Sequence, residues 1–218
     1  DQKEYNSQMD CNIISFLFRK IKDKTEIKLV PVDNYKCDQA SINIFLGVIN
    51  NCFFPYAKYN ILIPSQHTFK KYWIYNLQYF DKILCKTEYI KSIFETHVED
   101  KSKLEYIGWR SSDPNQSSEK NYNDFLLFCY DPNYTNYTKI VDSWKPEYPK
   151  LNIINGHYFG ISKTQDNIIY HNNLKQEEYD SLLNKCGFHL CLNGIDSFSH
   201  NINQCCLVKS IPILINGG

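Results

Sequence analysis

The 218-residue sequence lacks an excess of charge of either sign, since its 24 Lys and Arg side chains balance 24 Asp and Glu side chains. A neutral chain without a basic stripe argues against nucleic acid as the main partner. The sequence also lacks an apolar run that approaches the ~18 residues of a membrane span, and it shows no signal peptide. These absences favour a globular protein of the cytoplasm.

Cysteine is present, but not in the patterns that bind metals. None of the nine Cys residues forms a Cys-x-x-Cys pair, and the adjacent Cys205 and Cys206 suit neither a zinc site nor an easy disulfide. We therefore expect reduced cysteines that serve as small apolar residues. No His and Asp cluster has the spacing of metal ligands either, so no metal and no other cofactor is expected.

The composition is that of a globular chain, with 43% hydrophobic and 15% aromatic residues, which allows a large aromatic core. Enrichment in Asn, Lys, Ile and Tyr is typical of AT-rich genomes, such as those of large DNA viruses or protists. For a viral protein, the expected compartment is the host cytoplasm. The chain starts at Asp1 and stops at Gly217-Gly218, so we expect that it is incomplete at one or both ends.

Short β-type runs alternate with helical stretches along the whole chain. Strands are expected at 27–32, 59–63, 82–85, 103–107, 125–130, 151–155, 168–170, 188–192 and 211–215. Helices are expected at 38–51, 68–77, 88–97, 134–144, 175–185 and 197–208. Asp38 and Thr87 are the expected caps of two of these helices. This order predicts parallel sheets with helices on both faces.

A polar stretch at residues 111–123 interrupts the alternation, which then restarts. We therefore predict an α/β protein of two Rossmann-like parallel-sheet domains, at 1–116 and 117–218, the second without its last elements. Two such units in tandem normally bind a ligand in the cleft between them, at the C-terminal ends of the strands.

The segment 186–206 carries the strongest chemical signal. It predicts a buried strand, a tight turn with Gly194, and a helix that opens at Asp196 and Ser197. A helix N-terminus offers free N–H groups and a positive dipole end, which suits a diphosphate. Asp196 is then either a simple N-cap or a ligand contact.

This segment resembles the donor-binding motif of retaining GT-B glycosyltransferases, which often reads Glu-Gly-Phe-Gly-His, a spacer, then Asn-Glu-Ala. The two family glutamates stand eight positions apart, and here these positions hold Asp196 and Gln204. His200 and Asn203 match the motif, whereas serines replace its glycines. The donor-binding residues that the resemblance implies here are Ser197, Phe198, Ser199, His200 and Gln204.

The stretch 125–144 resembles the opening of the family's C-terminal domain. There, a Gly-Lys-Ser turn and a later Lys cradle the donor phosphates, before a helix that ends in Trp. The corresponding donor-binding positions here are Tyr130, Asp131 and Thr135, so both lysines are replaced. Trp144 taken alone indicates core packing. Further similar segments are 61–67, 80–94 and 107–113, and together the resemblance covers residues 59–216.

The resemblance implies a retaining transfer of a sugar from a nucleoside-diphosphate sugar to a hydroxyl of a glycan, protein or small-molecule acceptor. Asp196 would hold the donor in the second domain, and Pro64, Ser65 and Gln66 would face the acceptor. Asp196 and His67 are the catalytic candidates, although a lone His is more often structural. Arg110 and Lys139 could replace the missing cations, although Lys139 also fits a solvated helix face.

The altered lysines and glutamates favour a second hypothesis, in which the chain is a non-catalytic GT-B-like module. Such a module would bind a glycan or a nucleotide, or serve as a partner subunit. A third reading is an α/β domain of unrelated function. Binding and hydrolysis of nucleotide sugars separate these hypotheses.

We predict that this chain binds nucleotide sugars weakly or not at all. Repulsion between Asp131 and a diphosphate could reach about 1–4 kcal/mol at close range, which exceeds the roughly 0.3–1 kcal/mol that an exposed helix dipole contributes. Asp131→Lys with Thr135→Lys should then tighten binding tenfold or more in calorimetry with UDP and GDP. Unchanged binding would mean that these positions do not face the phosphates.

Overall fold

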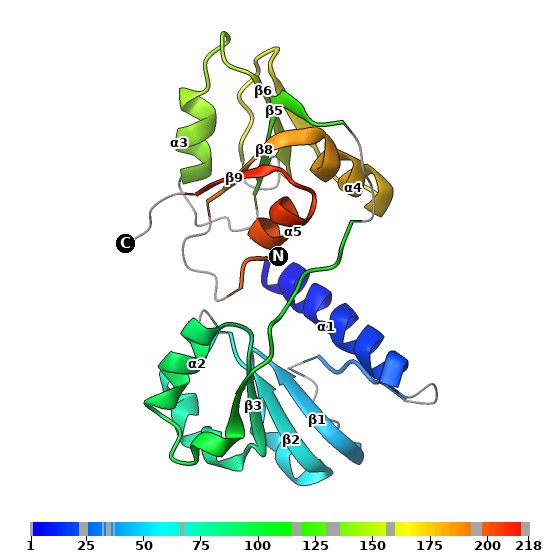
Figure 1. Cartoon of the computed structure of the whole chain (residues 1–218), viewed down its shortest axis with the longest axis vertical. Coiled ribbons are helices and arrows are strands. Elements are labelled where there is room, and N and C mark those ends of the chain that lie inside the picture. Colours follow the sequence, from blue (N-terminus) through cyan, green and yellow to red (C-terminus); the bar gives the residue numbers. More distant parts are fainter. Residues whose placement is uncertain are drawn as a thin grey trace. The chain divides into compact units, whose positions relative to one another are not determined.

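Two separate parallel sheets form the framework of the protein in the computed structural model (Figure 1). The structure describes residues 2–21, 26–31, 33, 36, 38–65, 68–114, 119–129, 136–155, 160–192 and 198–214. The chain divides into two units, one of Asn6–Arg110 with Ile195–Phe198, the other of Asp1–Tyr5, Ser111–Gly194 and Ser199–Gly218. The predicted α/β fold with two parallel sheets is confirmed, while residues 115–118 around the predicted domain boundary lie outside the described residues.

The first unit, called the four-stranded unit below, contains strands in sequential order β1-β2-β3-β4. They are β1 (Ala40–Leu46), β2 (Ala57–Ile63), β3 (Lys82–Cys85) and β4 (Leu104–Tyr106). Its other elements are α1 (Gln2–Ile21), most of which belongs to this unit, η1 (Asn51–Tyr56), η2 (Lys71–Tyr79), α2 (Glu88–Glu95) and η3 (Lys101–Lys103). All strand pairs are parallel, so the carboxyl ends of the strands share one edge.

Helix α2 shows how the local sequence builds this unit. The Thr87 side chain accepts a hydrogen bond from the Ile90 backbone N–H at 3.2 Å, as the sequence predicts for an N-cap. Ile90 and Phe94, one turn apart, are both buried in the core that includes Ile83 of β3. The apolar stripe of the helix therefore faces the sheet.

The second unit, called the five-stranded unit below, has the strand order β7-β6-β5-β8-β9, and all its pairs are parallel. The strands are β5 (Asn121–Phe128), β6 (Lys150–Ile154), β7 (Ile168–His171), β8 (Cys186–Cys191) and β9 (Ile211–Leu214). The helices are α3 (Asn136–Ser143), α4 (Gln176–Lys185) and α5 (His200–Leu207). The chain first builds outward from β5 to β7 and then returns to place β8 on the other side of β5, which is the Rossmann-like order.

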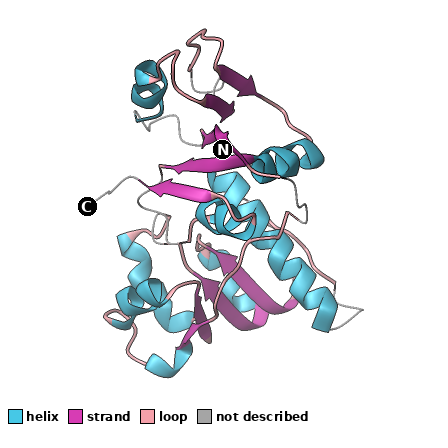
Figure 2. Cartoon of the chain, turned by 45° about the horizontal axis from the view of Figure 1, so that its top comes forward, coloured by secondary structure: helices cyan, strands magenta, loops and turns pink. Residues whose placement is uncertain are grey.

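Helices cover both faces of this sheet (Figure 2). Leu127 of β5 packs in a core with Tyr137 and Val141 of α3. Leu126, its neighbour in β5, packs on the opposite face with Leu183 of α4. A central parallel strand buried on both faces is apolar throughout, and this is why the run 125–130 is so easily recognised as a strand.

Three sequence-based expectations in the four-stranded unit are wrong. Residues 27–31 are not a strand, and residues 40–46 of the expected helix 38–51 form β1 instead. The β-branched Ile42 and Ile44 favour a strand, and parallel pairing with β2 stabilises it. The expected helix 68–77 is the 3-10 helix η2. Helix α1 was not expected, because its polar sequence has no clear apolar stripe.

Other expectations about side chains are confirmed. The eight cysteines in the described part of the chain are free, and five of them are buried. Trp144 packs against the core of the five-stranded unit, and its Nε1 donates to the Pro149 carbonyl at 2.9 Å. Lys139 lies on an exposed part of α3. None of the described helices combines the length and hydrophobicity that a membrane crossing requires.

Gly47, directly after β1, provides a test of how tightly the carboxyl edge of the four-stranded sheet is packed. Its φ of +69° favours glycine, and a Cβ there would lie 2.9 Å from Thr68 Oγ1 and 3.2 Å from Ser65 Cβ. Gly108 has a similar φ of +60°, but its Cβ would meet only Tyr106 atoms at 3.9 and 4.0 Å.

We expect Gly108→Ala to lower the free energy of unfolding by about 1–2 kcal/mol through backbone strain alone. Gly47→Ala should cost about 1–3 kcal/mol more, since it adds overpacking to the same strain. Urea unfolding of both variants measures the difference. Equal losses of unfolding free energy in the two variants would show that Ser65 and Thr68, in the loop after β2, move aside for the added methyl group at no energetic cost.

Candidate ligand-binding site

The strand order of the five-stranded unit indicates where a ligand would bind. In the sheet, β5 and β8 are neighbours, β6 lies next to β5, and β9 lies next to β8. The chain that leaves β5 therefore runs toward one edge of the sheet, and the chain that leaves β8 runs toward the opposite edge. Folds of this type bind ligands outside the carboxyl ends of the strands at such a reversal. The segments that follow β5 and β8 hold five sequence-predicted residues that lie outside the described residues, namely Tyr130, Asp131, Thr135, Asp196 and Ser197. His67, which follows β2 in the other unit, also lies outside the described residues.

The helix after β8 begins later than the sequence predicts. Ser199 is its N-cap, and the Ser199 hydroxyl accepts a hydrogen bond from the Ile202 backbone N–H at 3.4 Å. The expected start at Ser197, with Asp196 as the alternative N-cap, is therefore wrong for α5, which begins at His200. Ser fits an N-cap because its short side chain reaches the free N–H groups of the first turn. Phe198 and Ser199 are half-buried.

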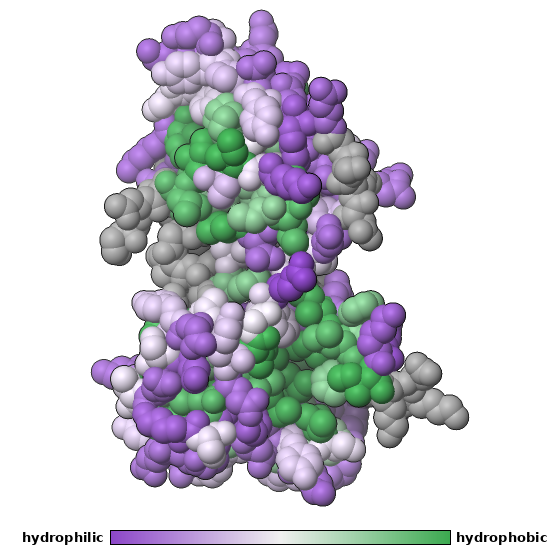
Figure 3. Space-filling view, in the orientation of Figure 1, coloured by the Kyte–Doolittle hydropathy of each residue, from purple (hydrophilic) through white to green (hydrophobic). Residues whose placement is uncertain are grey.

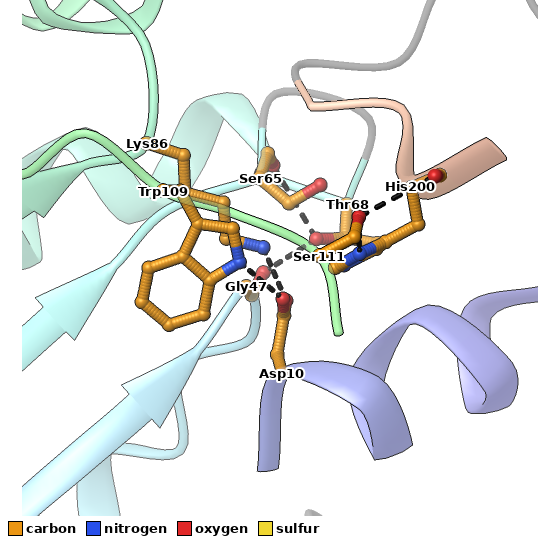
Figure 4. A network of polar contacts seen from close by, with 8 residues as sticks. All are labelled: Asp10, Gly47, Ser65, Thr68, Lys86, Trp109, Ser111 and His200. Carbon is orange, nitrogen blue, oxygen red and sulfur yellow. Dashed lines mark hydrogen bonds and ion pairs between the residues drawn. The ribbon is translucent and has the colours of Figure 1, made fainter. Parts of the chain in front are cut away.

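His200 lies buried at the first position of α5, with 2% of its surface exposed. The Ser111 hydroxyl lies 2.8 Å from His200 Nδ1 and donates to the His200 carbonyl at 3.3 Å (Figure 4). The Ser111 backbone N–H also donates to Asn203 Oδ1 at 2.9 Å. His200 and Asn203, the two residues that match the family motif, thus fasten the segment at Ser111 to the first turn of α5.

Gln204, which stands where the family has its second glutamate, is also buried, with 2% of its surface exposed. The Tyr179 hydroxyl of α4 donates to Gln204 Oε1 at 3.1 Å. This bond joins α5 to α4, so the two helices lie on the same face of the sheet. Contact of His200 or Gln204 with a donor remains a prediction, and both side chains have partners inside the unit.

Burial keeps the imidazoles of two other histidines of this unit, His189 and His171, uncharged near neutral pH. Burial lowers the pKa of His189 in β8 to about 4, and its Nε2 donates to the Leu183 carbonyl at 3.1 Å. Burial also lowers the pKa of His171 in β7. Neutral imidazoles with these partners add no positive charge for a diphosphate.

His171, Asn152 and Cys186 form a chain of contacts that could be mistaken for a nucleophilic triad. His171 Nε2 donates to Asn152 Oδ1 at 3.0 Å, and Asn152 Nδ2 donates to Cys186 Sγ at 3.6 Å. Burial, the largest effect, raises the pKa of the Cys186 thiol to about 12, so the thiol stays protonated. The amide stands between the thiol and the imidazole, and the arrangement is a buried packing contact.

The predicted acceptor-side loop follows β2 in the four-stranded unit. Pro64 is buried and Ser65 is half-buried, while Gln66 lies outside the described residues. The Ser65 carbonyl accepts hydrogen bonds from the backbone N–H groups of Thr68 at 3.2 Å and Phe69 at 2.9 Å. The Thr68 hydroxyl donates to the Gly47 carbonyl at 2.6 Å, which ties this loop to the end of β1.

Arg110, proposed as a replacement phosphate contact, is exposed after β4. Sequence reasoning missed a more buried cation nearby in the chain, Lys86, which forms an ion pair with Asp10 of α1. Only the fold brings these two residues together, because Lys86 lies in the stretch 80–94 that resembles the family, whereas Asp10 lies in none of the similar segments. The described residues hold no group of three or more His, Cys, Asp or Glu side chains arranged to bind a metal ion.

Gln204→Glu restores the residue of the family motif and separates a donor contact from a packing role. A buried carboxyl has a folded-state pKa above its unfolded value of about 4.3. The folded chain then binds the proton more tightly, so stability should fall by up to about 1.4 kcal/mol per pH unit as the pH rises above that value. Thermal unfolding from pH 4 to pH 8 measures the loss.

The exposed Gln78 offers a control, because Gln78→Glu should leave the pH profile unchanged. A Gln204→Glu variant with the wild-type pH profile, stabilised by a nucleoside diphosphate, would contradict the packing role and support a ribose contact.

No protein-family model matches the sequence, and a comparison with curated proteins finds no match either.

Proposed function

We propose that the chain is a glycosyltransferase that moves a sugar from a nucleoside-diphosphate sugar to an acceptor hydroxyl with retention of configuration. The observation that carries the proposal is the strand order β7-β6-β5-β8-β9. The two segments that resemble the family's donor-binding motifs, 125–144 and 186–206, contain β5 or β8, and their candidate donor contacts come after these strands, at which the order reverses. Sequence resemblance and topology therefore point independently to the same edge of one sheet.

In this proposal, the five-stranded unit binds the donor and the four-stranded unit binds the acceptor. Asp196 contacts the transferred sugar, and residues Ser197 to Ser199 approach the diphosphate ahead of α5. In such a transfer the bond from the sugar to the donor breaks, a nucleoside diphosphate leaves, and the negative charge that develops on its diphosphate must be stabilised. Arg110 is the candidate cation, since the lysine positions of the family hold Asp131 and Thr135. His67 is the candidate catalytic residue on the acceptor side.

One structural observation favours a second candidate function, that of a non-catalytic binding module. His200 and Gln204, which stand at motif positions, are both almost fully buried and bonded within their own unit. Side chains committed to such contacts can hold the fold of a transferase after its chemistry has been lost. A module of this kind binds a nucleotide or a glycan but does not break the glycosidic bond.

Donor hydrolysis separates the two functions. The chain is incubated with UDP-, GDP- and ADP-sugars, and thermal shift reports binding while chromatography reports release of the free sugar. We expect weak binding and slow release for one donor. Asp196→Asn should lower the rate of release about 100-fold or more, the scale of losing one preorganised electrostatic contact.

Asp142→Asn is the matched control, because Asp142 is an exposed residue of α3 and its loss should leave the rate unchanged. Binding without release would support the module, and absence of both would reject both functions. Equal rates for Asp196→Asn and wild type would remove Asp196 from the donor site.

A further inference from the structure

A buried cation and a buried indole stand together at the carboxyl edge of the four-stranded sheet. Lys86 directly follows β3, and Trp109 follows β4. Lys86 is 7% exposed and Trp109 is 9% exposed. The Lys86 Nζ lies 5.3 Å from the centroid of the Trp109 ring, a cation–π contact. The ends of parallel strands are where such sheets bind ligands, so this pair occupies a position suited to ligand recognition.

The pair binds a carboxylate in the structure, and the carboxylate belongs to Asp10 of α1 (Figure 4). Trp109 Nε1 donates to Asp10 Oδ1 at 3.0 Å. The other oxygen, Oδ2, forms the ion pair with Lys86 Nζ. The two oxygens of the carboxylate thus receive donors from two different residues, Trp109 and Lys86, which are far apart in the sequence. This is a two-point arrangement that matches the geometry of a carboxylate.

Asp10 is the most deeply buried contact of helix α1, whose apolar Ile13 and Ile14 are only half-buried. Among the side chains of α1 that the structure describes, Asp10 is the only buried one. Phe16, Leu17 and Ile21 of the same helix are 60%, 47% and 81% exposed. Hydrophobic side chains are correspondingly visible at the surface of this unit (Figure 3). The buried core of the unit is built from residues between Phe45 and Leu104, all of which come after α1.

The energetics of a buried cation explain why a carboxylate is needed there. A buried ion pair contributes little compared with apolar packing, but removing one partner leaves an uncompensated charge and is strongly unfavourable. Lys86 therefore requires an anion whenever it stays buried. Its two-donor geometry with Trp109 requires a carboxylate, but not the carboxylate of Asp10 in particular.

We propose that Lys86 and Trp109 form a carboxylate-binding subsite, and that Asp10 of α1 occupies it as an internal competitor of a ligand carboxylate. A ligand that bears a carboxylate displaces Asp10 and releases α1 from the sheet edge. Because coupling between two occupants of one site is reciprocal, weakening the hold of Asp10 must strengthen the binding of the ligand. The subsite does not depend on the proposed sugar transfer.

Chemical rescue tests the subsite in the full chain. Asp10→Ala removes the internal carboxylate, and sodium acetate should then raise the melting temperature of the variant more than sodium chloride does at equal ionic strength. Wild type should show no difference between the two salts, because Asp10 fills its subsite. Phosphate should rescue less well than acetate, and equal rescue by both would overturn a carboxylate-specific site.

A matched control is available in the exposed ion pair of Asp38 with Lys28. Asp38→Ala also removes a carboxylate from a lysine, but the lysine is solvated, so acetate should have no specific effect. If Asp10→Ala does not fold, Asp10→Asn replaces it, since the amide keeps the size of the side chain and removes only its charge. An Asp10 variant that responds to acetate no more than Asp38→Ala does would reject the subsite.

Displacement of α1 is tested separately by amide hydrogen exchange of wild type with glucuronate, a carboxylate-bearing sugar, and with glucose as its neutral match. Glucuronate should increase exchange along α1 and leave β2 and β3 unchanged, whereas glucose should have no effect. Asp10→Asn should bind glucuronate about tenfold more tightly than wild type, within the usual range of coupling between competing groups. Unchanged exchange of α1 at saturating glucuronate would overturn the role of Asp10 as a competitor.

Discussion

The burial of β5 on both faces is the constraint on which the rest of the five-stranded unit depends. Leu126 and Leu127, neighbours in this strand, have no exposed surface and face opposite layers of helices. Covering both faces requires α3 on one side and α4 on the other, and the chain achieves this only by returning past β5 to form β8. The reversal that positions the candidate site is therefore a consequence of how the core is covered.

Polar contacts, by contrast, fix the positions of the helices. Ser111 binds the first turn of α5, the Tyr179 hydroxyl joins α4 to α5, and Asp10 anchors α1. Such contacts add specificity of position, because a hydrogen bond fails when either partner moves, whereas apolar side chains tolerate sliding. His200, Asn203 and Gln204, which stand at positions that resemble the motif, take part in this positioning.

Local signals in the sequence predicted most of the fold. Thr87 was recognised as a cap because its partner Ile90 is three residues away, and the apolar run 125–130 was recognised because burial on both faces leaves no polar position. The strand β1 was mistaken for a helix, since Ile42 and Ile44 alternate with residues that fit either structure and the deciding contact with β2 is not local.

The candidate site was only partly predictable. The segments after β5 and β8 follow from motif and topology, whereas the contacts of His200 with Ser111 and of Lys86 with Asp10 join residues 89 and 76 positions apart.

The anchoring of α1 also affects the order in which the four-stranded unit can form. Asp10 meets partners that lie 76 and 99 positions later in the sequence, whereas β1, β2, β3 and β4 pair in the order in which they are synthesised. Closing such long loops costs entropy that is recovered only when both partners are in place. During translation, α1 therefore leaves the ribosome well before Trp109, which donates to Asp10, has been synthesised. The helix docks after the sheet has formed, and its Phe16 and Ile21 stay exposed even in the folded chain.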